Sequence, residues 1–382
     1  MNFELTEDQK LVQEMVRDFS QKEIIPMAKS LEESHAYPNE LLKKLSDLGI
    51  LGMTIPPEYE GIRTDSLSLV LALEELSKVL PSISVIISVH CSLFCYSILK
   101  FGTKQQKEKY LPQAAKGKII GAFSLTEPGA GSDATNLKTK SVKRGDKYIL
   151  NGTKSWITTG SESDAFIIFA AADTEAKLKR LNAFIVEKSL PGLQVSKIEE
   201  KMGLHSSPTA DIVLEECQVP AENLLGEEGK GSSIAFHCLD RSRVGIAAQS
   251  VGISQRALDE AARYAKQREA FGKKIAEFQA LQFMIADMST LIDAARLLTY
   301  KAASLCDTGK PFTKEASMAK LFASEAANKI AYQALQIHGG YGYSKEFFVE
   351  QIYRDARVLT IYEGTSEIQR LVIARNLLTE YE

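Results

Sequence analysis

The chain has 382 residues, of which 45% are hydrophobic and 25% charged, a composition typical of a globular protein with two or three domains. Lys and Arg number 46 against 49 Asp and Glu, so the net charge is −3. Nucleic acid is therefore excluded as the main partner, because phosphate binding needs clustered positive charge. Five cysteines exclude a disulfide scaffold. Because the N-terminus also lacks the pattern of a signal or transit peptide, a cytoplasmic protein is expected.

The first third of the chain has helical periodicity. Thr6 and Gln9 have the spacing of a capping box and precede an apolar helical face, and Asp65 can cap a later helix. Ser and His residues interrupt the apolar segment 83–99, which favours a buried helix over a membrane span. An N-terminal helical domain is predicted over residues 1–118.

The periodicity changes near residue 119. Short apolar runs rich in β-branched residues alternate with turn residues, a pattern that indicates strands. Asn151-Gly152 separates the runs 148–150 and 155–158, and this dipeptide suits a type I′ turn, so a hairpin is predicted there. A middle β-domain is expected over residues 119–230.

Helical periodicity returns after a Gly-rich loop and continues to the C-terminus. A C-terminal helical domain is therefore predicted over residues 231–382, and its expected helices lie near 232–268, 277–307, 313–338 and 364–378. The order of helices, strands and helices predicts a multi-domain α+β protein. It differs from the strand and helix alternation of a doubly wound nucleotide-binding fold.

Two local motifs have ordinary explanations. Gly129 to Ala134 fits the dinucleotide fingerprint G-x-G-x-x-A, but no βαβ unit surrounds it, so it is interpreted as a Gly-rich loop whose backbone can approach a phosphate or a flavin. His90, Cys91 and Cys95 lack a matching second pair of ligands, so buried cysteines are favoured over a metal site, and no metal is expected.

Two charged residues are ambiguous when each is taken alone. Glu363 lies between an apolar run and Gly364-Thr365-Ser366, where a solvated loop acid is more common than a catalyst. Arg243 would most often be a charge on a helix surface. Their interpretation depends on the rest of the chain.

Four blocks in a fixed order carry a resemblance that covers essentially the whole chain. They are FSLTEPGAGSD (123–133) with NGTKSWIT (151–158), REAFG (268–272) with FQ (278–279), QIHGGYG (336–342), and RDAR (354–357) leading to IYEGTSEIQR (361–370). The chain resembles the acyl-CoA dehydrogenase family, and among its branches the short-chain (butyryl-CoA) one.

The resemblance implies a fold and a reaction. The fold would be an N-terminal α-helical domain, a β-barrel-like middle domain and a C-terminal four-helix bundle. The reaction, part of fatty acid metabolism, would be FAD-dependent α,β-dehydrogenation of an acyl-CoA thioester to the 2-enoyl-CoA. Glu363 would remove the α-proton, hydride would pass from the β-carbon to flavin N5, and electrons would go on to an electron-transfer flavoprotein.

The resemblance also implies the residues that hold FAD and substrate. The cofactor contacts would be Phe123, Leu125, Thr126, Gly131, Ser132, Trp156, Thr158, Gln336, Gly340, Thr365 and Glu367, with Arg268, Phe271 and Gln279 acting across a subunit boundary. The substrate contacts would be Ser132, Asp240, Arg243 and Gly364. The backbone N–H of Glu363 and a flavin ribityl hydroxyl would bind the thioester carbonyl. A homotetramer is expected, because the site would be shared between subunits.

Some features narrow the choice within the family. Relatives that carry the base on the helix of Arg243 place it one residue earlier, where this chain has Ser242, so Glu363 is favoured. Segment 81–99 contains no Arg or Lys, which disfavours a dicarboxylate and leaves a short, branched or cyclic acyl group. The remaining alternatives are an acyl-CoA oxidase and a non-catalytic paralogue that binds acyl-CoA or flavin.

Overall fold

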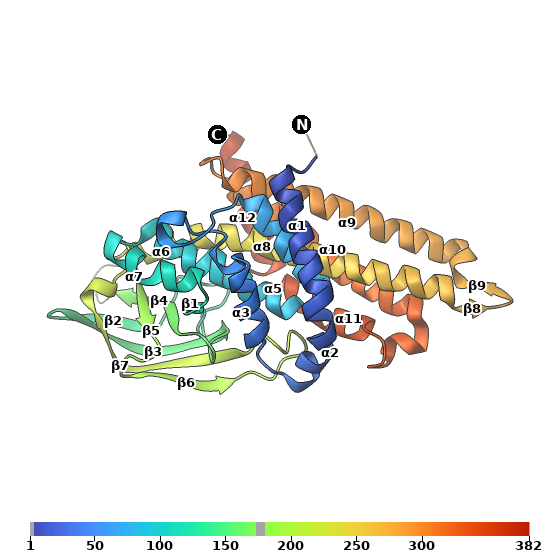
Figure 1. The fold of residues 1–382 in the computed structure, drawn as a ribbon. Helices are drawn as coiled ribbons and strands as arrows, with labels where there is room; N and C mark the ends of the chain where they lie inside the picture. Colours follow the sequence, from blue (N-terminus) through green and yellow to red (C-terminus); the bar gives the residue numbers. More distant parts are fainter. Residues whose placement is uncertain (1–3, 173–179, 382) are drawn as a thin grey trace.

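The computed structural model describes residues 4–172 and 180–381. Figure 1 shows a β-sheet region at one side of the molecule and helices from both ends of the chain packed beside it, with the long helices extending away to the other side. The predicted order of a helical, a β and a second helical domain is confirmed.

The described part of the N-terminal domain consists of helices and connecting loops, without a strand. The Thr6 hydroxyl accepts a hydrogen bond from the Gln9 N–H at 3.3 Å, and the Gln9 side chain accepts one from the Thr6 N–H at 2.9 Å, so the predicted capping box is confirmed. Asp65 caps α4 as expected. The α-helices are α1 (Glu7–Phe19), α2 (Ile25–Ser34), α3 (Asn39–Asp47), α4 (Ser66–Ser77), α5 (Pro81–Ser88), α6 (Tyr96–Phe101) and α7 (Lys104–Ala115).

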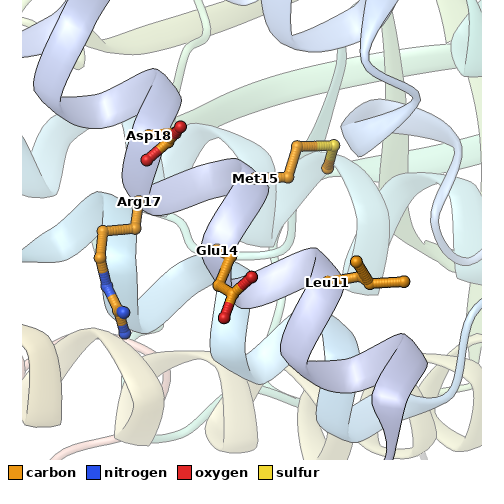
Figure 2. Close-up of a pocket in the computed structure, with 5 residues that line it drawn as sticks. All are labelled: Leu11, Glu14, Met15, Arg17 and Asp18. Atoms are coloured by element: carbon orange, nitrogen blue, oxygen red, sulfur yellow. The ribbon is translucent and has the colours of Figure 1, made fainter.

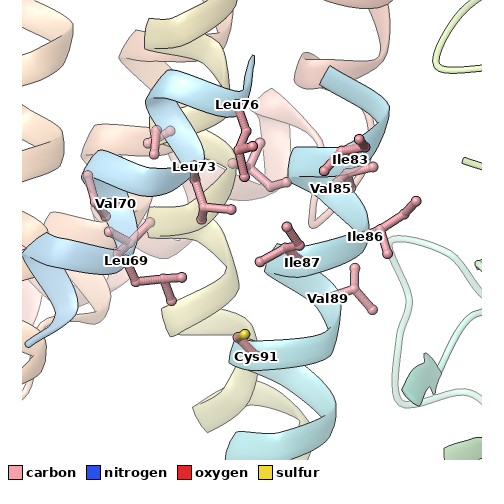
Figure 3. Packing of buried hydrophobic residues seen from close by; sticks show 14 of the residues in the cluster. Leu69, Val70, Leu73, Leu76, Ile83, Val85, Ile86, Ile87, Val89 and Cys91 are labelled. Atoms are coloured by element: carbon pink, nitrogen blue, oxygen red, sulfur yellow. The ribbon is translucent and has the colours of Figure 1, made fainter. Parts of the chain in front are cut away.

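Helix α5, the π-helical segment η4 (Val89–Cys95) and α6 form one apolar helical stretch. Pro81–Phe101 is long and apolar enough to cross a membrane, but 89% of its most apolar window is buried inside the protein. Figure 3 shows side chains of α4, among them Leu73 and Leu76, on the side that faces α5, and the Ile87 side chain points toward α4. The segment is therefore a core helix of the fold, as its sequence predicts.

The middle domain is a seven-stranded sheet in the order β1-β4-β2-β3-β7-β6, with β5 paired to β4. Strand β4 pairs in parallel with β1 and β2, and the remaining pairs are antiparallel. The strands are β1 (Gly121–Ser124), β2 (Lys140–Arg144), β3 (Lys147–Thr158), β4 (Ala165–Ala172), β5 (Leu181–Glu187), β6 (Leu193–Ile198) and β7 (Thr209–Pro220).

The hairpin predicted at Asn151-Gly152 is wrong. Both residues lie inside the continuous strand β3, whose partner β7 shifts register between Leu150 and Gly152. The Asn151 side chain bonds to Glu216 of β7 rather than closing a turn. A Gly in a strand often marks such an irregularity, which the dipeptide alone does not distinguish from a turn.

Three long helices dominate the C-terminal domain. They are α8 (Gly231–Gln267), α9 (Gln279–Cys306) and α10 (Thr313–His338), followed by α11 (Val349–Arg357) and α12 (Ser366–Leu378). Helix α11 was not among the predicted elements. A short hairpin of β8 (Glu269–Ala270) and β9 (Lys273–Lys274) projects at the end of α8 and α9, at the right of Figure 1.

Strand β4 connects the two hydrophobic cores. Phe166, Ile168 and Ala170 enter a core within the sheet domain, whereas the alternate residues Ile167 and Phe169 join the larger core shared with the helices. Side chains of a strand alternate between its faces, so β4 is buried on both sides. This strand therefore fixes the sheet against the helical domains, and with it the residues that the sheet contributes to the site.

Candidate active site

Glu363 lies in a short loop between α11 and α12, and the loop has an unusual backbone. Glu363 and Gly364 have φ angles of 53° and 95°, both in the left-handed region. A non-glycine residue pays for this conformation, by about 1–3 kcal/mol, and it persists where surrounding contacts fix it. Contacts that fix this loop are therefore required.

Buried donors hold both carbonyls of this loop. The Gln369 amide donates to the carbonyl oxygens of Glu363 at 3.2 Å and Gly364 at 2.9 Å. The Lys320 ammonium, on α10, donates to the Gly364 carbonyl at 2.7 Å. Thr365 then caps α12 by accepting the Ile368 N–H at 3.3 Å, so the loop is fixed at both ends.

The Glu363 carboxyl group is withdrawn from water. Its Oε2 atom is buried and has no hydrogen-bond partner within the described ranges. Burial raises the pKa of Glu363, and the nearby charges of Arg243 and Lys320 oppose that rise. The Ser242 hydroxyl faces the carboxyl group and also lowers its pKa, but its oxygen makes no hydrogen bond of standard geometry there. A buried carboxylate with spare acceptor capacity is suited to take up a proton.

Asp240 and Arg243 form a buried ion pair one helical turn apart on α8, with 2.7 Å between Oδ1 and Nη1. The exposed fractions of the two residues are 9% and 5%. Thr313 donates a further hydrogen bond to Asp240. The structure thus brings Glu363, Gly364 and Arg243 of the predicted site together, and Arg243 lies in the interior rather than on a helix surface.

The predicted flavin loop follows β1 and is fastened to β3. The Ser155 N–H donates to the Thr126 carbonyl at 3.0 Å, and the Lys154 ammonium donates to the Leu125 carbonyl at 3.1 Å. Lys154 also forms an ion pair with Glu127 at 2.8 Å, and both side chains are almost fully buried. Within the predicted contacts, Leu125 and Thr126 therefore have a rigid backbone.

Phe123 of β1 and Ser132 of the following loop differ in burial. Phe123 packs against Phe169 with ring centroids 4.9 Å apart, so its ring belongs to the core. Gly131 and Ser132 are exposed. A flavin contact by Phe123 would consequently have to use its backbone, whereas Ser132 offers its side chain.

Trp156 interrupts the regular pattern of β3. Its φ is 60° and its exposed fraction is 58%, at the point where the register with β7 shifts between Lys154 and Ile157. An exposed indole held on a strained strand has an aromatic face free to cover a planar ring. Thr158, two residues on, pairs with Thr209 in the regular ladder.

The predicted inter-subunit residues, together with the predicted FAD contacts Gln336 and Gly340, lie toward the opposite end of α10 from Glu363. Gln336 follows Lys320 by sixteen residues on one helix, which corresponds to about 24 Å. Phe271, on the β8–β9 hairpin, is 95% exposed, and Arg268 lies 5.6 Å from the ring of Tyr341. Within a single subunit, these residues are therefore far from Glu363. The exposed ones are Arg268, Phe271, Gln279, Gln336 and Gly340.

The described residues fit an FAD. A Cβ built at Gly131 or Gly340 meets nothing within 4 Å, so a ligand can approach either backbone closely. The exposed indole of Trp156 and the buried, unpartnered oxygen of Glu363 provide the aromatic face and the acceptor that flavin chemistry on a C–H bond needs. Glu367 is exposed in the first turn of α12.

Sequence reasoning assigned no role to Lys320, Gln369, Lys154 or Glu127. The last three lie within the quoted blocks, but nothing local marks them as supports of the loops. Lys320 had one available signal, because it interrupts a face of α10 formed by small residues such as Ala316 and Ala323. A depression on α1 (Figure 2), lined by Leu11, Glu14, Met15, Arg17 and Asp18, contains none of the predicted residues.

Comparisons with known proteins give the family. Three sequence profiles match in order: "Acyl-CoA dehydrogenase, N-terminal domain" over residues 6–118, "Acyl-CoA dehydrogenase, middle domain" over 122–217 and "Acyl-CoA dehydrogenase, C-terminal domain" over 229–378. The short-chain specific acyl-CoA dehydrogenase of Rattus norvegicus mitochondria is 48% identical over 378 residues, which cover 99% of this chain and 92% of the relative.

Solved structures agree with the sequence matches. The butyryl-CoA dehydrogenase of Megasphaera elsdenii superposes with a TM-score of 0.97 at 43% identity and covers 99% of this chain and 100% of its own. A chain from work on the electron transferring flavoprotein of Acidaminococcus fermentans gives 0.96 at 46% identity, with coverage of 99% and 100%. The chain belongs to the acyl-CoA dehydrogenase family of FAD-dependent oxidoreductases.

Proposed function

We propose that this enzyme dehydrogenates a short-chain acyl-CoA thioester between Cα and Cβ, with Glu363 as the base. The observation that carries the proposal is the Glu363 carboxyl group, which is buried, has a raised pKa and presents an oxygen without a partner among the described residues. A general base accelerates proton removal by roughly 10²–10⁴-fold when its pKa approaches the working pH.

The residues around Glu363 have separate tasks in this reaction. The Glu363 carboxylate takes the α-proton, and its own backbone N–H would bind the thioester oxygen, where negative charge accumulates as the proton leaves. Gly364, without a side chain, lets the thioester approach this backbone. FAD, when bound, supplies the acceptor for the hydride of the β-carbon.

The Asp240–Arg243 pair would keep a positive charge near the Glu363 carboxyl group and balance that charge within the pair. Arg243 lowers the pKa of Glu363 by its charge, and Asp240 Oδ1 accepts a hydrogen bond from Arg243 Nη1 at 2.7 Å. A fully buried and unpaired guanidinium would be much more costly. The pair thus limits the rise of the pKa of Glu363 that burial causes.

A short acyl chain is the substrate that this chain and its relatives favour. Two of the relatives reported above are named as a short-chain specific acyl-CoA dehydrogenase and a butyryl-CoA dehydrogenase. In this chain, Val89, Phe94 and Cys95 are fully or almost fully buried in the segment predicted to line the acyl pocket, and no cation occurs in 81–99 to balance a second carboxylate. Dicarboxylates are therefore disfavoured as substrates.

We also propose that electrons leave to an electron-transfer flavoprotein and that the enzyme is a homotetramer. The first rests on the family and on the origin of the similar Acidaminococcus fermentans chain. The second is supported by Phe271, whose side chain is 95% exposed. Phe271 lies toward the opposite end of α10 from Glu363 of its own subunit. A neighbouring subunit would bring such a residue to the cofactor.

Anaerobic mixing of the FAD-loaded enzyme with acyl-CoA thioesters tests the proposal. Butyryl-CoA should bleach the flavin absorbance rapidly, longer and branched substrates more slowly, and glutaryl-CoA not at all. Failure of every thioester to bleach it would support the non-catalytic alternative. Stoichiometric peroxide formation in air would identify an acyl-CoA oxidase instead.

A further inference from the structure

Lys320 is a fully buried cation on α10 that forms no ion pair with a described carboxylate. Its exposed fraction is 0%, and no described carboxylate oxygen lies within the 4.0 Å that defines an ion pair. Its ammonium instead donates to the Gly364 carbonyl at 2.7 Å, in the loop where two successive residues have positive φ. An unneutralised buried charge is costly, so its presence beside the base calls for an explanation.

The charges that face Lys320 fall into two groups. Glu325 and Glu367 are exposed, and water screens them. Glu363 and Arg243 are the buried charged groups in its surroundings, and Arg243 is already paired with Asp240. The charge of Lys320 therefore acts mainly on Glu363.

The Gly364 carbonyl has two donors that differ in one respect. Lys320 brings a hydrogen bond with a positive charge, whereas Gln369 brings a hydrogen bond at 2.9 Å without one. Both fix the orientation of the loop that carries the Glu363 carboxyl group. Only Lys320 can also stabilise the ionised form of that carboxyl group.

We propose that Lys320 is a positioning residue for the base: its ammonium anchors the Gly364 carbonyl and keeps the Glu363 carboxyl group in place and ionised. This inference rests on the proposed function of Glu363. Lys320 would then have two effects: its hydrogen bond holds the geometry of the loop, and its charge favours the ionised form of Glu363. A purely structural residue would have only the first effect.

The test compares Lys320→Met with Gln369→Met by anaerobic stopped-flow reduction of the flavin with butyryl-CoA at a series of pH values. Each substitution removes a donor to Gly364, so each should slow reduction, by up to about 10²-fold if the carboxyl group is displaced by an ångström. The rate rises with pH as the base ionises. The pH range of this rise, called the pH limb below, should move to higher pH in Lys320→Met and stay at the wild-type pH in Gln369→Met, because only Lys320→Met loses a charge.

FAD content and the spectral shift on binding crotonyl-CoA serve as measures of an intact site. Lys320→Gln keeps a donor but no charge, and should show the shifted limb with a smaller loss of rate. Wild-type rate and limb in Lys320→Met would overturn the inference, as would equal limb shifts in Lys320→Met and Gln369→Met. Loss of FAD with both Lys320 substitutions would also overturn it, in favour of a purely structural role.

Glu363→Gln, measured alongside, distinguishes the two proposals. If Glu363→Gln reduces its flavin at nearly the wild-type rate, the assignment of the base fails. If Glu363→Gln is inactive but Lys320→Met behaves as the wild type, the assignment of the base stands and the role of Lys320 fails.

Discussion

Two loops of this protein are each anchored by a fully buried lysine, and the two lysines differ in how their charge is balanced. Lys154 donates to the Leu125 carbonyl in the predicted flavin loop (residues 125–133). Lys320 donates to the Gly364 carbonyl in the loop that carries Glu363 (residues 361–365), called the base loop below. Burial lowers the pKa of each to about 8. Lys154, however, has the Glu127 carboxylate at 2.8 Å, whereas no described carboxylate is as close to Lys320.

The difference shows what each loop needs. At the flavin loop the charges of Lys154 and Glu127 cancel, and Glu127 in turn accepts the N–H groups of Lys138 and Thr139 at 2.6 and 3.1 Å. That arrangement is rigid and electrically neutral, which suits a surface that only has to hold a cofactor. At the base loop the charge is left facing Glu363, where it can influence ionisation.

The strongest test of the base loop is Glu363→Gln. The amide has nearly the shape of the carboxylate but cannot accept the α-proton, so flavin reduction by butyryl-CoA should fall by at least about 10²–10⁴-fold. FAD content and crotonyl-CoA binding should be retained. Glu346→Gln, at an exposed residue, is the control and should reduce its flavin normally. Rapid bleaching of the flavin in Glu363→Gln would remove the base from this loop.

The flavin loop should respond differently to loss of its lysine. Lys154→Met leaves the Glu127 carboxylate buried without its cation, which costs about 3–5 kcal/mol of stability. We expect a lower melting temperature and weaker FAD retention. The double substitution Lys154→Met with Glu127→Gln should recover part of the loss, because it leaves no isolated charge.

The pH dependence of the remaining activity completes this comparison. In FAD-reconstituted Lys154→Met, the rate of flavin reduction should rise with pH over the same range as in the wild type, because no charged group near Glu363 has changed. A limb displaced as far as that expected for Lys320→Met would show that the two lysines do not differ in the way proposed.

Sequence alone could predict much of the fold because its signals are local. The capping box at Thr6, the Asp65 cap and the periodicity of α10 depend on residues a few positions apart, and the structure confirms them. The predicted hairpin failed because Asn151-Gly152 satisfies turn geometry, while the register of β3 against β7 depends on a strand more than fifty residues later.

The candidate site divides in the same way. Glu363 could be singled out because its neighbours form a continuous motif, and the structure places it in a loop with a left-handed backbone, where its Oε2 atom is buried. The contact of Lys320 with Gly364 joins residues 44 positions apart, and Lys154 with Leu125 joins residues 29 apart. Only folding brings such supports together: the small residues around Lys320 on α10 are a local sign of its burial, but no local pattern identifies the carbonyl that it contacts.

Arg268 tests whether the cofactor site extends beyond one subunit. Arg268→Ala should weaken FAD retention by about 10-fold, the effect of losing one charge-assisted hydrogen bond to an anionic ligand, and should loosen the assembly. Size-exclusion chromatography and the FAD-to-protein absorbance ratio measure both effects. Arg263→Ala, at another exposed arginine near the end of α8, is the matched control. An FAD-loaded tetramer unchanged by Arg268→Ala would contradict the shared site.

A third buried charge, Asp355 on α11, extends the comparison to a carboxyl group. It accepts the Leu204 N–H at 2.7 Å and so ties α11 to the loop between β6 and β7. Burial, together with the charge of Glu32, raises the pKa of Asp355 to about 7, although Arg354 opposes the rise. The protonated form is thus favoured in the folded protein relative to the unfolded chain, where an aspartate titrates near 4.

The sign of the resulting pH dependence follows from linkage. Because the folded-state pKa exceeds the unfolded value, the stabilisation is full below about pH 4 and is lost as the pH rises through about 7. The melting temperature should therefore fall by a few degrees from pH 6 to pH 8, and Asp355→Asn, which cannot ionise, should flatten this decline. Asp18→Asn, on exposed α1, should keep the wild-type slope. If the melting temperature of Asp355→Asn falls with pH as steeply as that of the wild type, the Asp355 carboxyl group is ionised over the whole pH range measured. A buried charge without an ion-pair partner among the described residues would then be present in this protein at a residue to which no function is assigned.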